Sequence, residues 1–119
     1  TPNEDNESDW IKPFSFEIKL YRGLPGFWIV KGRISSAAYK HLECSVNRSD
    51  IRSIKETLKQ DKNFLGVGCL DYSYPIELGQ EVVHNPLFNN RAHSIIKGRK
   101  SGSIAKKLAR QSQLVFEEK

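Results

Sequence analysis

A strict alternation near the start of the chain constrains the fold more than any other feature. From Phe14 to Leu20, every even position is apolar, and the positions between them are polar or charged. A period of two is typical of a strand with one face in the core. The turn-forming run Gly23–Gly26 follows, and residues 27–30 begin a second β-type run. The sequence therefore predicts a β-hairpin over residues 14–34 that seeds an antiparallel sheet.

The middle of the chain mixes helix and strand signals. Residues 50–62 carry apolar side chains at helical spacing after a cluster of capping residues, which predicts an amphipathic helix. Residues 64–76 are rich in aromatic and β-branched side chains and predict a strand that Pro75 ends or places at an edge. Residues 34–46 fit two alternatives, a short helix capped by Ser35 or Ser36 and running to Leu42, or further strand.

The last third is predicted to hold short elements around a loop. Short strands are expected at 81–84 and 95–96, and residues 97–102 form a loop. Ser103 is expected to cap a final helix that carries Ile104, Leu108 and Leu114 or Val115.

The predicted fold class is α+β, with one small domain. A chain of 119 residues can bury a single modest core without disulfides or metals. Residues 1–12 hold four carboxylates among Asn, Ser and Pro, which predicts a disordered acidic leader. Residues 13–119 then form an antiparallel sheet with one or two packed helices, and the segment 82–116 wraps around the outside.

Several protein classes are excluded by composition. No apolar run approaches the ~20 residues of a membrane span, and no secretory signal opens the chain. Cys44 and Cys69 are too few for a disulfide scaffold or a metal knuckle. The expectation is a small cytoplasmic domain with no cofactor, no metal and no membrane partner.

Charge is distributed unevenly along the chain. Residues 1–81 carry 11 basic and 12 acidic side chains, whereas residues 82–116 carry seven basic ones and no Asp or Glu. A segment of this kind creates a local positive field that attracts phosphate or an acidic partner. The alternative is a solvated basic face without a partner.

A glycine-containing loop before the last helix is the strongest anion-binding pattern. Helix N-termini present free N–H groups that bind anions. In this loop, basic side chains add positive charge and serine hydroxyls add further hydrogen-bond donors. The spacing does not fit a Walker A loop, and too few residues follow Arg110 for a helix-turn-helix. The predicted nucleic-acid-binding residues are Arg91, Lys97, Arg99, Lys100, Ser101, Lys106, Lys107 and Arg110.

Two histidines in the same segment suggest a catalytic alternative. Metal-independent ribonucleases need an acid, a base and a cation, which His84, His93 and Arg91 could supply. The competing interpretation is that both histidines are ordinary surface residues. Tyr21, Tyr72 and Tyr74 are left open as rings that could face outward and stack on bases.

The sequence thus supports two functions of different classes. The first is a basic domain that binds the backbone of RNA or DNA, with a toxin-type ribonuclease as its enzymatic version. The second is a non-enzymatic interaction module, such as an inhibitor or immunity-type protein, that binds an acidic protein. Residue types do not distinguish phosphate from carboxylate as the counter-charge.

Overall fold

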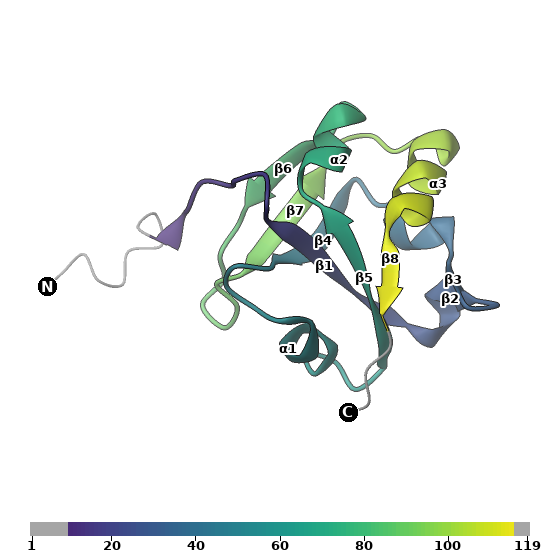
Figure 1. Cartoon of the computed structure of the whole chain (residues 1–119), viewed down its shortest axis with the longest axis horizontal. Helices are drawn as coiled ribbons and strands as arrows, with labels where there is room; N and C mark the ends of the chain where they lie inside the picture. Colours follow the sequence, from purple (N-terminus) through teal and green to yellow (C-terminus); the bar gives the residue numbers. More distant parts are fainter. Residues whose placement is uncertain (1–9, 116–119) are drawn as a thin grey trace, which may run out of the picture.

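A six-stranded antiparallel sheet organises the chain, in the order β6-β7-β4-β1-β5-β8 (Figure 1). The computed structural model describes residues 10–115. The strands of this sheet are β1 (Lys19–Pro25), β4 (Glu43–Arg48), β5 (Phe64–Asp71), β6 (Glu81–His84), β7 (His93–Lys97) and β8 (Gln113–Val115). A separate two-stranded sheet pairs β2 (Ile29–Val30) with β3 (Arg33–Ile34).

Helices are short and occupy the connections. The α-helices are α1 (Ile54–Leu58), α2 (Ser73–Glu77) and α3 (Gly102–Gln111), and the 3-10 helices are η2 (Gly26–Trp28) and η3 (Ser36–Tyr39). The predicted α+β class with an antiparallel sheet is confirmed.

The two faces of the large sheet have different surroundings. Leu20, Leu24 and Ile96 lie on one face and belong to the core cluster that α3 and η3 complete. The other face carries Asn47 and His93, and α1 covers part of it, with Asn47 bonded to Thr57 of α1. One face is therefore core, and the other is open to polar side chains.

The predicted hairpin over 14–34 does not form as one unit. β1 pairs with β4 and β5, and the hairpin in this region is β2–β3, closed by Lys31 and Gly32 with positive φ values of 52° and 75°. Two positive φ values suit a two-residue hairpin turn. Gly23 lies inside β1, where an added Cβ would approach the Phe64 ring to 2.1 Å. The glycine at 23 provides room for a ring, so the expected turn at 23–26 is wrong.

The start of the alternation also differs from the prediction. The strand begins at Lys19, and Phe16 is 81% exposed. Phe14 precedes the strand and packs through its ring, with centroids 4.6 Å from Tyr72 and 6.3 Å from His84.

Other boundaries shift because of local capping. α1 begins after Ser53, whose capping box with Glu56 fixes the start, and it ends at Leu58. β5 ends at Asp71, and residues 73–76 of the predicted strand instead belong to α2, whose first turn accommodates Pro75. Both alternatives for 34–46 are partly present, since Ser35 caps η3 and β4 follows.

The C-terminal segment is part of the fold and does not wrap around the outside. Its strands β6 and β7, at the predicted positions, extend one side of the sheet, and β8 forms the opposite edge. α3 is capped by Ser101 instead of Ser103. Leu114 and Val115 lie in β8, so they are not part of the last helix.

The N-terminal boundary is earlier than predicted. Trp10 is buried, and the Lys12 backbone is hydrogen-bonded to Arg48 and His84. Residues 10–12 are therefore packed, whereas the rest of the predicted leader, residues 1–9, lies outside the described residues. Within residues 10–115, no helix is long and apolar enough to cross a membrane.

Candidate nucleic-acid interface

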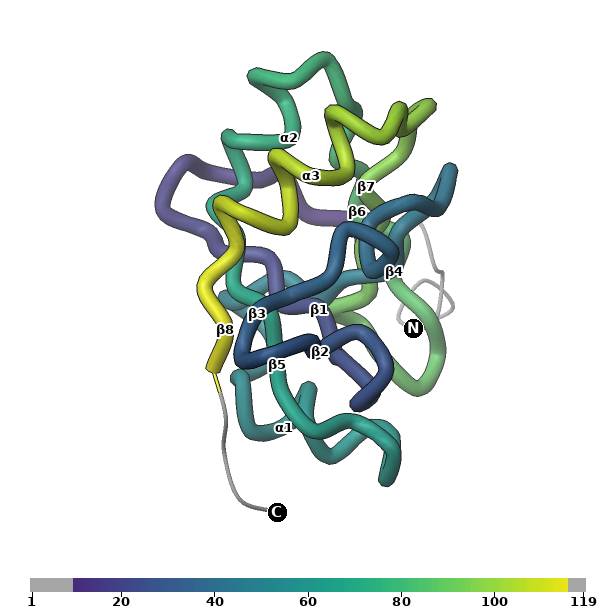
Figure 2. Tube along the Cα trace, turned by 90° about the vertical axis from the view of Figure 1, so that its right-hand side faces the viewer, coloured from purple at the N-terminus to yellow at the C-terminus, as the bar shows by residue number. Residues whose placement is uncertain are grey.

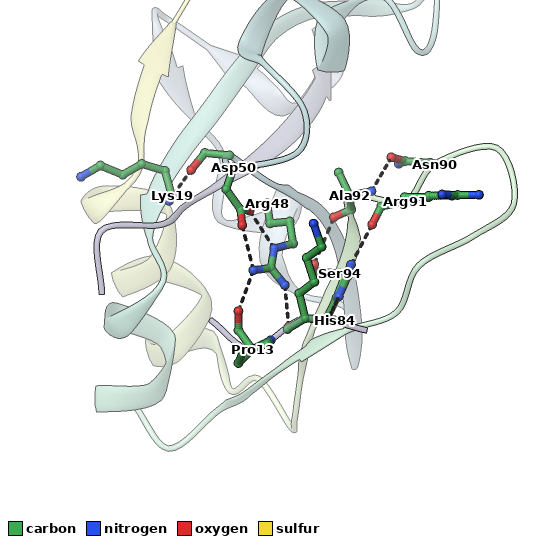
Figure 3. Close-up of polar contacts among 11 residues, drawn as sticks. Pro13, Lys19, Arg48, Asp50, His84, Asn90, Arg91, Ala92 and Ser94 are labelled. Carbon is green, nitrogen blue, oxygen red and sulfur yellow. Dashed lines mark hydrogen bonds and ion pairs between the residues drawn. The ribbon is translucent and has the colours of Figure 1, made fainter. Parts of the chain in front are cut away.

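His84 is a buried histidine with both ring nitrogens bonded to backbone. Nδ1 accepts from the Lys12 N–H at 2.9 Å, and Nε2 donates to the Arg91 carbonyl at 2.7 Å (Figure 3). This pair of partners fixes the neutral tautomer with the proton on Nε2. Desolvation lowers the pKa of the His84 imidazole. The side chain is held as a structural bridge, with no nitrogen left to face a substrate.

His93 lies on the opposite face of the sheet from His84. His84 pairs with Ser94, and consecutive residues on β7 point to opposite faces. The His93 ring donates from Nδ1 to the Asn85 carbonyl at 2.9 Å, and Nε2 lies 3.2 Å from the Ser45 hydroxyl. The structure does not bring the two predicted catalytic histidines to one site.

Arg91 is the third predicted catalytic group, and it lies on the His84 side. Its guanidinium carbon is 4.2 Å from the centroid of the Trp10 ring. This cation–π contact helps hold the N-terminal segment on the core face. The Arg91 guanidinium is thus engaged with Trp10, whereas the His93 ring is bonded to Asn85 and Ser45.

The basic residues at the end of β7 lie opposite acidic residues or are already bonded to carbonyls. Lys97 lies directly opposite Glu43 on one neighbouring strand and Glu81 on the other. Lys100 donates from Nζ to the carbonyls of Leu42, Ile96 and Gly98, at 3.1, 2.9 and 2.8 Å.

Arg99 and Ser101 complete the loop. The Arg99 side chain is exposed, and its carbonyl accepts from Gln80. Ser101 caps α3 by accepting from the Ile104 N–H at 3.3 Å. Arg99 and Lys97 are thus the exposed cations of the predicted loop, whereas the Lys100 ammonium is already bonded to carbonyls.

The remaining predicted cations form one exposed surface on α3. Lys106, Lys107 and Arg110 are all exposed and lie within one turn of each other, with Ala105 and Leu108 buried behind them. Next to this helix stands the β2–β3 hairpin, as Figure 2 shows. The five exposed cations of the helix and hairpin are here called the basic face: Lys31, Arg33, Lys106, Lys107 and Arg110.

A groove of about 350 Å³ separates the hairpin from α3. Gly32, Arg33 and Ile34 line one wall, and Ala109 and Arg110 line the other. No Asp or Glu lines the groove, and within residues 10–115 none of the five cations forms an ion pair. Two arginines line this acid-free groove, and such an arrangement creates a local positive potential.

The hairpin half of the basic face was not predicted. Residues 18–42 contain five basic side chains and no Asp or Glu, as a second acid-free segment. That segment packs against the first one through η3 and α3, where the Tyr39 hydroxyl lies 2.7 Å from Ser112 Oγ. The signal was present in the sequence, but the pairing of the two segments required the fold.

A pocket of about 250 Å³ opens where β1 and β4 separate. The two strands pair only at Leu20–Arg48 and Tyr21–Asn47. Beyond that point the buried Arg22 guanidinium fills the gap, donating to Ala38 O at 2.7 Å and to Ser45 O at 2.6 Å. The pocket is lined by Tyr21, Trp28, Asn47, Gln60, Asn90 and His93, among others, and by no Asp or Glu.

Metal-ligating side chains do not gather anywhere in residues 10–115. No group of three or more His, Cys, Asp or Glu side chains lies close enough together to hold an ion. Comparison of the chain with protein-family models, with curated proteins and with solved structures finds no match.

Proposed function

We propose that this protein binds nucleic acid by its phosphate backbone, through the basic face. The groove between Arg33 and Arg110 carries this proposal, because it places two guanidinium groups on opposite walls without a neighbouring carboxylate. Guanidinium groups bind phosphate oxygens in a bidentate manner. The three lysines of the basic face lie on either side of the groove, and their charge extends the positive field along the backbone of a bound strand. They are Lys31, Lys106 and Lys107.

The geometry fits binding of nucleic acid better than cleavage of RNA by the two histidines. His84 and His93 lie on opposite faces of the sheet, and neither lines the groove. The ribonuclease version therefore finds no support in the site and stays a prediction, which incubation with an end-labelled RNA tests directly.

The salt dependence of binding tests the proposal. Fluorescence anisotropy with labelled RNA and DNA, single- and double-stranded, is measured between about 0.05 and 0.2 M salt. Replacing Arg33 and Arg110 together with Ala removes two phosphate partners. The log–log salt slope should then shrink by roughly 1.4 for single strands and roughly 1.8 for duplex DNA.

A matched control uses two exposed lysines on the other side of the sheet. Lys55→Ala with Lys59→Ala removes the same charge from α1 and its end, and the salt slope should stay close to that of the native chain. An equal loss in both double variants would show diffuse attraction to net charge. Absence of binding to every probe at low salt would overturn the proposal and favour an acidic protein as the partner.

A further inference from the structure

We infer that the pocket between β1 and β4 takes one unstacked nucleobase of a single strand bound to the basic face, an inference that rests on the proposed function. Its volume of about 250 Å³ is below the roughly 300–1,000 Å³ of pockets for drug-sized ligands. A ligand of this size is a single base with part of its sugar.

The lining has the chemistry that base recognition needs. The rings of Tyr21, Trp28 and Phe64 provide flat apolar surfaces, and the amides of Asn47, Gln60 and Asn90 provide donors and acceptors. Protein sites that recognise single-stranded RNA combine aromatic stacking with hydrogen bonds to base edges. The pocket has both kinds of groups on its walls.

A chain of hydrogen bonds holds the amides in fixed orientations. Asn90 Nδ2 donates to Asn47 Oδ1 at 2.8 Å, and Asn47 Nδ2 donates to Gln60 Oε1 at 2.9 Å. Within residues 10–115, this leaves Gln60 Nε2 without a protein partner. His93 Nε2 already accepts from the Ser45 hydroxyl at 3.2 Å, because Nδ1 donates to Asn85 O. Gln60 Nε2 is therefore a pre-oriented donor available to a base edge.

The charge of the pocket favours an anionic nucleotide over a cationic ligand. Arg22 is 7% exposed, and no carboxylate within the described residues pairs with it. Its guanidinium lies 4.8 Å from the Trp28 ring and donates to the carbonyl oxygens of Ala38 and Ser45. A buried cation without an anion makes the pocket positive, and a phosphate at the mouth supplies the missing counter-charge.

The pocket and the basic face are joined through Trp28. This residue lines the pocket, and its carbonyl accepts from the Ser35 N–H at 2.8 Å at the base of the β2–β3 hairpin. The preceding residue, Phe27, is 74% exposed and contacts the Trp28 ring at 5.5 Å between centroids. A strand that crosses the hairpin thus meets exposed and pocket aromatics in succession.

Trp28 fluorescence tests base insertion directly. The chain has two tryptophans, so a Trp10→Phe background reports Trp28 alone. Tetranucleotides of adenosine, cytidine or uridine are titrated at low salt, and binding is followed in parallel by anisotropy. At least one of them should quench the fluorescence of Trp28, and the midpoint of the quenching curve should equal that of the anisotropy curve.

Two variants separate the pocket from the basic face. Ser45→Tyr places a ring at the exposed rim of the pocket and should remove the quenching and weaken binding roughly tenfold. Gln60→Ala should weaken binding of one base more than the others, whereas Gln113→Ala on β8, also exposed, should change nothing. Thermal melting confirms that each variant folds.

The outcomes distinguish this inference from the proposed function. Salt-dependent binding with unchanged Trp28 fluorescence, and with native affinity in Ser45→Tyr, would overturn the pocket inference and leave backbone binding intact. No binding of any strand at low salt would overturn both.

Discussion

At the residue scale, buried polar side chains tie the N-terminal segment to the core face. Arg48 is 1% exposed and donates to the carbonyls of Lys12 and Pro13 and to both carboxylate oxygens of Asp50 (Figure 3). Its guanidinium also lies 4.3 Å from the Phe14 ring centroid. Together with the His84 bond to the Lys12 N–H, this arginine fastens residues 10–14 across the sheet.

The same contacts make stability depend on pH. Burial lowers the folded-state pKa of His84 below its ordinary 6.5, so the unfolded chain binds a proton that the folded chain does not. The His84 contribution to stability is complete above pH 6.5 and is lost as the pH falls. We expect the melting temperature to drop from pH 7.5 to pH 5.5, and to drop less in His84→Gln.

Exposed His41 provides the control for this measurement. His41→Gln replaces the same residue type at an exposed position, and its melting curves are measured over the same pH range. An unchanged pH dependence in His84→Gln would show that another group causes the loss.

Residue roles were the least predictable level from the sequence. His84 and Lys100 were both selected for charge or proton transfer, yet their partners are backbone atoms, including Lys12 for His84 and Leu42 for Lys100, which lie far along the chain. Residue type and spacing do not reveal such partners. The buried position of Arg22 depends equally on the separation of β1 from β4, which no local pattern encodes.

At the element scale, the presence of helices and strands was predicted better than the residues at which they begin and end. β6 and β7 lie where the short β-rich runs were expected, and an amphipathic helix occurs within 50–62. The predicted hairpin was wrong because glycine occurs in strands and turns for different reasons. Gly23 allows the Phe64 ring to pack closely, whereas Gly32 adopts a positive φ in a turn. Sequence does not separate these uses without knowing which ring lies opposite.

The capping box of α1 offers an element-scale prediction. Ser53 accepts from the Glu56 N–H, and the Glu56 carboxylate accepts from the Ser53 N–H. Ser53→Ala should reduce the free energy of unfolding by about 1 kcal/mol, measured by urea denaturation. Ser36→Ala serves as a control, since Ser35 caps that turn; an equal loss there would argue against a special role of the box.

At the scale of the whole molecule, the fold decides which charges act together. The total of +5 and the acid-free segment 82–116 were visible in the sequence. The fold divides that segment, setting Lys97 between two glutamates and placing α3 beside the second acid-free segment. Only Lys106, Lys107 and Arg110 of its seven cations belong to the basic face.

This division predicts unequal effects for equal charge changes. Lys97→Ala combined with Lys100→Ala removes two positive charges, as does Lys107→Ala combined with Arg110→Ala. The first pair should leave the salt slope of nucleic-acid binding nearly unchanged, and the second should lower it by roughly 1.4 for single strands. Lys100 is bonded to three carbonyls, so its replacement could lower stability, and melting curves are measured for the first variant. Lys97→Ala alone is measured as well. A reduced slope in Lys97→Ala would contradict the assignment.

The strand order of the large sheet has a consequence for how the chain folds. Among the strands of residues 10–115, β1 is synthesised first, yet it lies in the middle of the sheet, with Leu20 paired to Arg48 on one side and Leu70 on the other. Long loops must close before these pairs form, which slows folding. The apolar face of β1 is covered in part by α3, which ends at Gln111, so the nascent chain exposes Leu20 and Leu24 until that helix has been synthesised.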